Sequence, residues 1–250
     1  MSRLNRPRVP VLCYVTDRRN LVPGESSEAR QPFDACKILL EKIAASAAAG
    51  VDWIQIREKD LSGKECSSLT REAMTLIASS SPPDSAKGST SSKTEATREK
   101  VSTRILVNDR LDVALAAQAG GVHLGEKSLP LEEARRLAKS LQRKKDFLVG
   151  VSCHSLEAAE DAARGGADYL FFGPVFATPS KTAYGAPQGL ERLAEVCRAV
   201  ALPVLAIGGI TLENAADCIS AGASGLAAIR LFQDAADLAA IVRALREVST

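Results

Sequence analysis

Four segments of this chain end a helical pattern with a small residue and glycine and then begin a strand at once: AAGVDWIQI (Ala48–Ile56), AGGVHLG (Ala119–Gly125), GGADYLFFG (Gly165–Gly173) and AGASGLAAI (Ala221–Ile229). Glycine after the last helical turn suits a left-handed C-cap, because it has no Cβ to clash. The runs that follow are rich in Val, Ile, Leu and Phe without regular alternation, which is typical of parallel strands buried on both faces. This repeated unit predicts an α/β barrel.

Around these four segments we expect a (β/α)8 TIM barrel that forms a single domain over residues 1–250. The expected strands are Val9–Asp17, Trp53–Lys59, Arg104–Asp109, Gly121–Gly125, Phe147–Cys153, Tyr169–Phe176, Pro203–Gly209 and Gly225–Ile229. The expected helices are Pro32–Ala49, Glu65–Ser79, Leu111–Gln118, Pro130–Leu141, Leu156–Arg164, Leu190–Ala199, Leu212–Ala221 and Asp234–Val248. Ser62, Ser155 and Thr211 are suitable caps for three of them.

Two polar segments interrupt this alternation. Residues 79–100 are rich in Ser, Thr and Lys and lack large apolar side chains, so we expect a disordered surface insertion at the amino-terminal end of the barrel. The stretch Arg19–Gln31 follows the first strand, which places it on the catalytic face, where it can act as a lid.

Composition excludes several classes of partner. Lys and Arg total 32 against 30 Asp and Glu, so the net charge of +2 gives no support for a nucleic-acid or membrane partner. No apolar run is long enough to span a membrane, and the basic N-terminus lacks the apolar core of a secretory signal. The six cysteines lack C-x-x-C spacing, which favours reduced thiols, a cytoplasmic location and no zinc site.

The second expected strand ends in an unusual group of polar residues. Alternation sends Gln55, Arg57 and Lys59 to one side, which in a closed barrel is the lumen. A lumen normally fills with aliphatic side chains, so two cations there predict an anion of the phosphate type, which Arg binds well. The alternative is that Arg57 and Lys59 are solvated charges at the rim, paired with Glu58 or Asp60.

The third strand ends in Asn108-Asp109, which has two interpretations. Asp109 beside Asn108 can hold Mg²⁺, an ion that binds one or two carboxylates together with phosphate oxygens. Either residue can instead be the N-cap of the helix that begins at Leu111.

Further polar residues follow the later strands. His123 lies on the fourth strand and can equally be a satisfied core histidine, whereas His154 lies at the rim and can exchange a proton. Thr178, Ser180 and Lys181 offer hydroxyls and a cation to a phosphate. Gly208-Gly209 and Arg230 follow the last two strands, where barrels commonly bind phosphate through backbone N–H groups. Two anionic groups are therefore expected at one mouth.

Taken together, seven blocks resemble the thiamine phosphate synthase/thiazole tautomerase superfamily, in the order of that family and over nearly the whole chain apart from Ser79–Lys100. They are YVTD (Tyr14–Asp17), QIREKD (Gln55–Asp60), LVNDRLDVAL (Leu106–Leu115), GVHLG (Gly121–Gly125), GVSCHS (Gly150–Ser155), DYLFFGPVFATPSK (Asp168–Lys181) and LAIGGI (Leu205–Ile210). The resemblance implies a (β/α)8 barrel, often a homodimer, closer to the synthase branch.

That branch couples a pyrimidine methyl pyrophosphate to a thiazole phosphate with Mg²⁺ and releases pyrophosphate. The resemblance implies that Gln55 contacts the pyrimidine, that Asp109 binds Mg²⁺ and that Ser152 lies beside the reacting pyrophosphate. The pyrophosphate would be held by Arg57, Lys59, Asn108 and Lys181, and the thiazole phosphate by Thr178, Ser180, Gly209 and Ile229.

The chain departs from the synthase pattern in two places. Ser128 stands where the family has a second Mg²⁺-binding Asp, and Glu126 is a candidate replacement. Arg230 stands where the family more often has Ser, and can strengthen the phosphate site or block it. These departures favour two alternatives: a metal-independent tautomerase that uses His154, and a non-catalytic sensor of phosphate ligands. Retention of Gln55, Lys59, Asn108, Asp109 and Lys181 favours the synthase.

Overall fold

The computed structural model describes residues 9–21, 32–79, 103–141, 146–178 and 186–248. Within them, eight parallel strands close into a barrel in the order of the sequence, which confirms the expected TIM barrel. The strands are β1 (Val11–Val15), β2 (Trp53–Ile56), β3 (Arg104–Asn108), β4 (Gly121–Leu124), β5 (Leu148–Cys153), β6 (Tyr169–Phe172), β7 (Val204–Ile207) and β8 (Gly225–Ala228). Each strand therefore pairs with its neighbour in sequence, and β8 pairs with β1.

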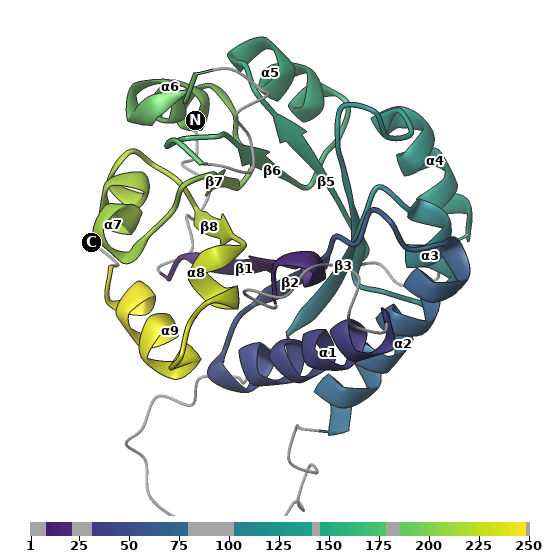
Figure 1. The fold of residues 1–250 in the computed structure, drawn as a ribbon. Helices are drawn as coiled ribbons and strands as arrows, with labels where there is room; N and C mark the ends of the chain where they lie inside the picture. The colour runs from purple at the N-terminus through teal and green to yellow at the C-terminus, as the bar shows by residue number, and fades with distance from the viewer. Residues whose placement is uncertain (1–8, 22–31, 80–102, 142–145, 179–185, 249–250) are drawn as a thin grey trace, which may run out of the picture.

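Helices surround the barrel as a ring (Figure 1). They are α1 (Pro32–Ala49), α2 (Gly63–Ser79), α3 (Leu111–Ala116), α4 (Leu131–Leu141), α5 (Leu156–Arg164), α6 (Gly189–Ala199), α7 (Leu212–Ser220) and α9 (Leu238–Glu247), with a single 3₁₀ turn, η1 (Arg18–Asn20). The short helix α8 (Arg230–Gln233) lies inside this ring (Figure 1). No helix of the described residues is long and apolar enough to cross a membrane.

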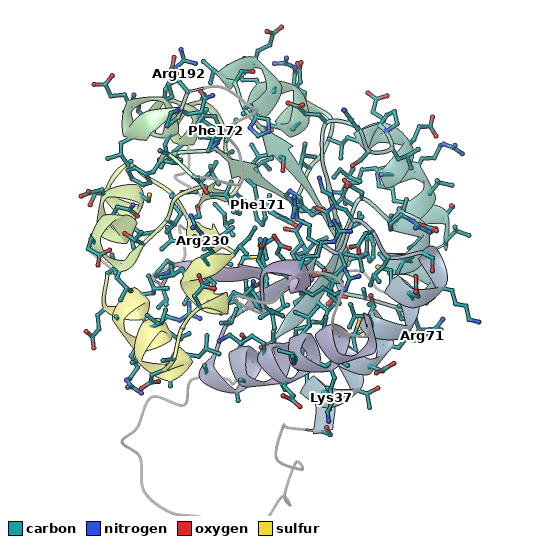
Figure 2. All side chains as sticks on the ribbon, in the orientation of Figure 1. Lys37, Arg71, Phe171, Phe172, Arg192 and Arg230 are labelled. Atoms are coloured by element: carbon teal, nitrogen blue, oxygen red, sulfur yellow. The ribbon has the colours of Figure 1, made fainter. Side chains whose placement is uncertain are left out.

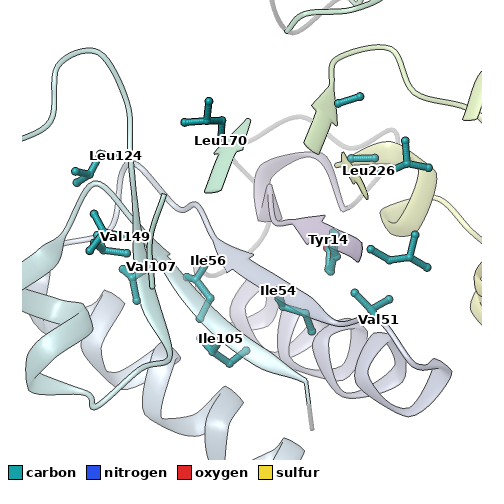
Figure 3. Packing of buried hydrophobic residues seen from close by; sticks show 14 of the residues in the cluster. Tyr14, Val51, Ile54, Ile56, Ile105, Val107, Leu124, Val149, Leu170 and Leu226 are labelled. Carbon is teal, nitrogen blue, oxygen red and sulfur yellow. The ribbon is translucent and has the colours of Figure 1, made fainter. Parts of the chain in front are cut away.

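Strand alternation divides the buried side chains into two layers. Leu12, Ile54 and Leu170 belong to the larger cluster between strands and helices, part of which is shown in Figure 3. The smaller cluster fills the lumen with Cys13, Val15, Leu106, Tyr169, Phe171, Leu205 and Ala227. Phe171 accordingly lies nearer the barrel axis than Phe172, its neighbour on β6 (Figure 2). Burial on both faces explains why these strands lack regular alternation in the sequence.

The glycines of the four repeated segments serve two purposes, not one. Gly50, Gly166 and Gly222 have φ angles of +95°, +84° and +105° and follow their helices as expected. In the second segment the positive φ belongs to Gln118, at +57°. There Gly120 and Gly121 instead allow close packing, because a Cβ at either would collide with the Arg104 side chain or the Leu148 carbonyl.

Several strands end earlier than the sequence predicts. The ladder of β2 stops at Ile56, not Lys59, and that of β6 stops at Phe172, not Phe176. The residues after these points lie in the connections over the carboxyl-terminal mouth of the barrel, and after β6 the Val175 and Phe176 N–H groups donate to the β7 side, to the Ile207 and Gly208 carbonyls over 2.9 and 3.0 Å. Residues 80–100 of the expected insertion and 22–31 of the expected lid lie outside the described residues.

Candidate active site

A partly buried chain of polar groups crosses from β2 to the end of β3 in the lumen. The Gln55 amide donates from Nε2 to Asn108 Oδ1 over 2.7 Å, and Asn108 Nδ2 donates to Asp109 Oδ2 over 2.6 Å. Gln55 is 2% exposed, and its Oε1 has no hydrogen-bond partner within the described part of the chain. An unpaired buried acceptor costs on the order of 1–3 kcal/mol, so the atom indicates a place where a ligand supplies a donor.

Asp109 has a backbone conformation that few aspartates adopt, with φ at +60°. Its Oδ1 accepts from the Gly125 N–H over 3.1 Å and from the Ser128 hydroxyl. The expected alternative, an N-cap by Asn108 or Asp109, is not what the structure has: Arg110 is the N-cap of α3. The Asp109 carboxylate points across the mouth toward the β4 loop, not back onto its own helix.

Asp109 and Ser128 offer an oxygen donor set that fits Mg²⁺. Ser128 Oγ donates to Asp109 Oδ1 and also accepts from the Gly125 N–H over 2.7 Å, so the two oxygens lie next to one another in direct contact. Mg²⁺ needs one or two carboxylates and completes its shell with phosphate oxygens and water. The described residues hold no group of three or more His, Cys, Asp or Glu side chains suited to a metal, so such an ion would rely on its substrate for further ligands.

Arg57 and Lys59 lie at the mouth, beside a pocket of about 520 Å³. The pocket is lined by Asp17, Arg19, Asn20, Arg57, Glu58, Lys59 and Asp60. Arg57 is half-buried and Lys59 is exposed. Among the described residues neither cation makes an ion pair, so the expected alternative of rim pairing with Glu58 or Asp60 does not hold there.

The two carboxylates next to those cations are bound by Arg18 of η1, a residue that the sequence analysis did not single out. Arg18 Nη1 lies 3.1 Å from Glu58 Oε2 and 2.6 Å from Asp60 Oδ1. The hydrogen bonds from Arg18 lower the pKa of Asp60 to about 2, whereas burial raises the pKa of Glu58 despite the same guanidinium. The DR dipeptide after β1 is the one sequence signal that could have drawn attention to Arg18.

Ser152 is held by a second buried chain of polar groups. Its Oγ lies 2.9 Å from His123 Nε2, and His123 Nδ1 lies 3.1 Å from the Tyr169 hydroxyl. His123 is 2% exposed, so it is the satisfied core histidine that the sequence allowed, with Ser152 as one of its partners. A Cβ at Gly150 would overlap the Tyr169 ring, so glycine there makes room for Tyr169.

His154 lies at the rim between the loops after β4 and β6. Its Nδ1 bonds to the Gly173 carbonyl, which can only accept, so Nδ1 carries the proton. Its Nε2 lies 3.8 Å from Oε1 of Glu126. The Glu126 side chain is 60% exposed and lies near His154, which leaves its expected role as a metal ligand a prediction.

The expected second anion site lies on the other side of the mouth, after β6, β7 and β8. Gly208 and Gly209 have φ angles of +97° and +68°, and a Cβ on Gly209 would lie 2.7 Å from that of Phe176. Ile229 is the N-cap of α8, and exposed Arg230 is the first residue of this helix (Figure 2). Thr178 is half-buried at the end of the described β6 loop, while Ser180 and Lys181 lie outside the described residues.

Comparison with known proteins gives a consistent result. The family model described as thiamine monophosphate synthase matches residues 86–232. The thiamine-phosphate synthase of Moorella thermoacetica is 41% identical over 84% of this chain and 88% of its own length. The thiamine-phosphate synthase of Roseiflexus castenholzii is 36% identical over 96% of this chain and 88% of its own length. The structure of a thiamine phosphate pyrophosphorylase from Pyrococcus furiosus is 31% identical, with a TM-score of 0.71 over 97% of this chain and 96% of that one.

Proposed function

The chain belongs to the thiamine monophosphate synthase family, and we propose that it is a thiamine-phosphate synthase. The reaction would join 4-amino-2-methyl-5-pyrimidinylmethyl diphosphate to hydroxyethylthiazole phosphate and release pyrophosphate. The observation that carries the proposal is the partly buried chain from Gln55 through Asn108 to Asp109, in which Gln55 Oε1 has no partner among the described residues. It supports an amide for the pyrimidine on β2 and a carboxylate for a metal–diphosphate group directly after β3.

The pyrimidine would lie in the lumen beside Gln55. The unpaired Oε1 of Gln55 can accept a hydrogen bond from the exocyclic amino group of an aminopyrimidine. Departure of pyrophosphate leaves a benzylic-type cation, which the electron-rich ring stabilises. The chain therefore needs no nucleophile or general base for this step, and its task is to orient the ring and neutralise the leaving charge.

The diphosphate would lie over the mouth, between Arg57 and Lys59 on one side and Asp109 on the other. The two cations stabilise the charge that grows on the leaving pyrophosphate. Asn108 and Ser152 add side-chain donors from the lumen, and Lys181 is expected to add a third cation. Asp109 and Ser128 would hold Mg²⁺, which, when bound, supplies further positive charge to the leaving group.

The thiazole phosphate would bind to the loops after β6, β7 and β8. Thr178, Ser180, the Gly209 backbone and Ile229 are expected to bind its phosphate, with Arg230 of α8 as an additional cation. Once the phosphate is fixed there, the thiazole nitrogen can approach the pyrimidine methylene carbon along the barrel axis. Attack by this nitrogen forms the new C–N bond and needs no proton transfer.

The coupling reaction itself tests the proposal. Purified protein would be mixed with both substrates, once with Mg²⁺ and once with a chelator, and thiamine phosphate would be measured by chromatography. We expect product only with Mg²⁺. If no product forms under either condition, the protein would be tested for isomerisation of the thiazole carboxylate phosphate. Isomerase activity that disappears in the His154→Asn variant would identify the tautomerase. Thermal stabilisation by these phosphates without any turnover would identify a sensor.

Two further expectations stay predictions. A homodimer can be tested by light scattering. A cytoplasmic location agrees with six free thiols in the structure, of which Cys36 and Cys197 are partly exposed.

A further inference from the structure

The segment Arg57-Glu58-Lys59-Asp60 alternates two cations with two carboxylates. If the carboxylates were left without other partners, they would lie within reach of the cations and compete with an anionic substrate for them. In the structure Arg18, which the proposed function does not use, binds both carboxylates, and Arg19 Nε lies 3.3 Å from Asp60 Oδ2 as an additional, exposed partner of that carboxylate.

Arg18 binds the two carboxylates with one guanidinium. It donates from Nη1 to Glu58 Oε2 over 3.1 Å, and from Nη1 and Nη2 to the two oxygens of Asp60 over 2.6 and 2.7 Å. The Arg18 backbone N–H lies 3.2 Å from both oxygens of Glu58. The planar fork of arginine suits this bidentate contact with Asp60, which a lysine ammonium cannot reproduce.

Burial separates the Arg18–Glu58 ion pair from the cation that is exposed to the ligand. The side chains of Arg18 and Glu58 are 8% and 2% exposed, so this ion pair is buried at the edge of the pocket, whereas Lys59 is exposed to solvent. Thr16 Oγ1 donates to Glu58 Oε1 over 2.6 Å and accepts from the Arg57 N–H over 3.0 Å. The same cluster therefore also fixes the backbone from which the Arg57 side chain starts.

We propose that Arg18 is a positioning residue for diphosphate binding: by holding Glu58 and Asp60, it leaves Arg57 and Lys59 available to the anion. This inference rests on the proposed function, because it takes the diphosphate as the ligand of those cations. The proposed effect of losing Arg18 is that a carboxylate changes its ion-pair partner. Without Arg18, Asp60 keeps Arg19 as a partner, but Glu58 loses its cationic partner and turns to Arg57 and Lys59, so the mouth loses positive potential although both cations remain.

The test uses inorganic pyrophosphate with Mg²⁺ as the probe, measured by calorimetry, together with steady-state coupling kinetics. In Arg18→Met we expect pyrophosphate affinity to fall and KM for the pyrimidine diphosphate to rise, each by about tenfold. Because Arg18 does not touch the substrate, kcat should change much less than KM. In Arg18→Met/Glu58→Gln/Asp60→Asn the competing charges are gone as well, and we expect most of the affinity to return.

The triple variant separates the proposal from a purely structural role. Neutralising Glu58 also relieves a buried unpaired charge, so the stability of each variant is measured by denaturant unfolding, and the affinities are compared at denaturant-free conditions where every variant is folded. Under those conditions a purely structural role predicts equal affinity in Arg18→Met and parent, whereas the proposal predicts weak binding in Arg18→Met that the triple variant restores; an equally weak triple variant would overturn the proposal. Arg135→Met is the matched control, because Arg135 pairs with Asp168 over 2.7 Å at the opposite end of the barrel. It should leave pyrophosphate affinity unchanged. Arg18→Lys covers the case in which Arg18→Met does not fold, and is expected to bind pyrophosphate several-fold more weakly; unchanged affinity would overturn the proposal.

The parent protein distinguishes this failure from that of the proposed function. Parent protein that makes no thiamine phosphate would refute the synthase activity, whatever the Arg18 variants do. Parent protein that turns over normally, together with an Arg18→Met variant of unchanged KM and pyrophosphate affinity, would refute the role of Arg18 alone.

Discussion

The two ends of this barrel use polar side chains in opposite ways. At the amino-terminal end, Asp52 accepts from the Leu12 N–H over 2.7 Å and pairs with Arg246 over 2.8 Å. Asp168, four strands further along, accepts from the Val149 N–H over 2.7 Å and pairs with Arg135. At the carboxyl-terminal mouth, Gln55 Oε1 has no partner among the described residues.

The difference separates groups that stabilise the fold from groups that await a ligand. At the amino-terminal end each aspartate satisfies a strand N–H and an arginine at once, so its charge is consumed by the protein. At the mouth the protein pairs Glu58 and Asp60 with Arg18 and leaves Gln55 Oε1 unsatisfied among the described residues. A TIM barrel can accept that cost at one end because the other end and the two apolar layers supply its stability.

The largest effect should follow from removing the charge of Asp109. Asp109→Asn keeps the shape but loses the carboxylate expected to bind Mg²⁺, so kcat should fall by about 10²–10³-fold, the usual size of a lost electrostatic contact in a transition state. The readout is thiamine phosphate formation at saturating Mg²⁺. A tautomerase would be nearly unaffected, and a fully active variant would exclude the metal role of Asp109.

Removing Asp168, in contrast to Asp109, should lower stability and leave activity unchanged. In Asp168→Ala, the Val149 N–H and Arg135 lose their acceptor in a partly buried site, which should lower the free energy of unfolding by about 2 kcal/mol. Activity per folded molecule should not change. Denaturant unfolding measures the free energy of unfolding, and coupling kinetics measure the activity per folded molecule. Asp146→Ala is the control at the same end, because the 3.4 Å pair of Asp146 with Arg104 is largely exposed and should contribute less than about 0.5 kcal/mol.

A single variant of Gln55 should separate an effect on substrate binding from an effect on stability. Gln55→Leu removes the unpaired Oε1 but also the donor to Asn108, so the two effects on stability should cancel to within about 1 kcal/mol. The KM for the pyrimidine diphosphate should nevertheless rise by about tenfold or more, because the ring loses its acceptor. Strong destabilisation without a change in KM would instead make Gln55 a structural residue.

The smallest effect should come from Asp60 and depend on pH. Its pKa in the folded protein, about 2, lies below the usual value of 3.8, so the charged form is the one that the fold favours. The stability that it contributes is therefore present above about pH 4 and lost as the pH falls toward 2. Asp60→Asn should be less stable than the parent at neutral pH, and the difference should shrink over that range in denaturant titrations. A difference that stays constant with pH would contradict this account.

Most of the fold could be predicted from local patterns. All eight strand–helix units follow from apolar runs, four of which begin after a glycine, and the three expected caps are present. The Glu65 N–H donates to Ser62 Oγ over 3.3 Å, the Ala158 N–H donates to Ser155 over 3.1 Å, and the Thr211 N–H donates to Asn214 over 2.9 Å. Helix α8 could not be predicted, because four residues are too few to show a periodic pattern. Gln118 could not be predicted as the left-handed residue, because the adjacent glycines offered a better local candidate.

The candidate site was only partly accessible from the sequence. Residues at the ends of adjacent strands must meet, which is why Arg57 and Lys59 after β2 and Asn108 and Asp109 after β3 could be grouped in advance as parts of one anion site. Arg18 and Glu58 are 40 positions apart, and each had a closer charged neighbour in the sequence with which to pair. Only the three-dimensional structure shows that the connections after β1 and β2 bring these two together.

Because Gly150 leaves space for the Tyr169 ring, the residue tolerated at position 150 depends on the residue at position 169. A methyl group at residue 150 would displace the tyrosine, and the displaced hydroxyl would release His123 and through it Ser152. Functional relatives with a side chain at the first position are therefore expected to carry a smaller residue at the second. Anyone who randomises this barrel should vary the two codons together, because single changes at residue 150 will be recovered as inactive.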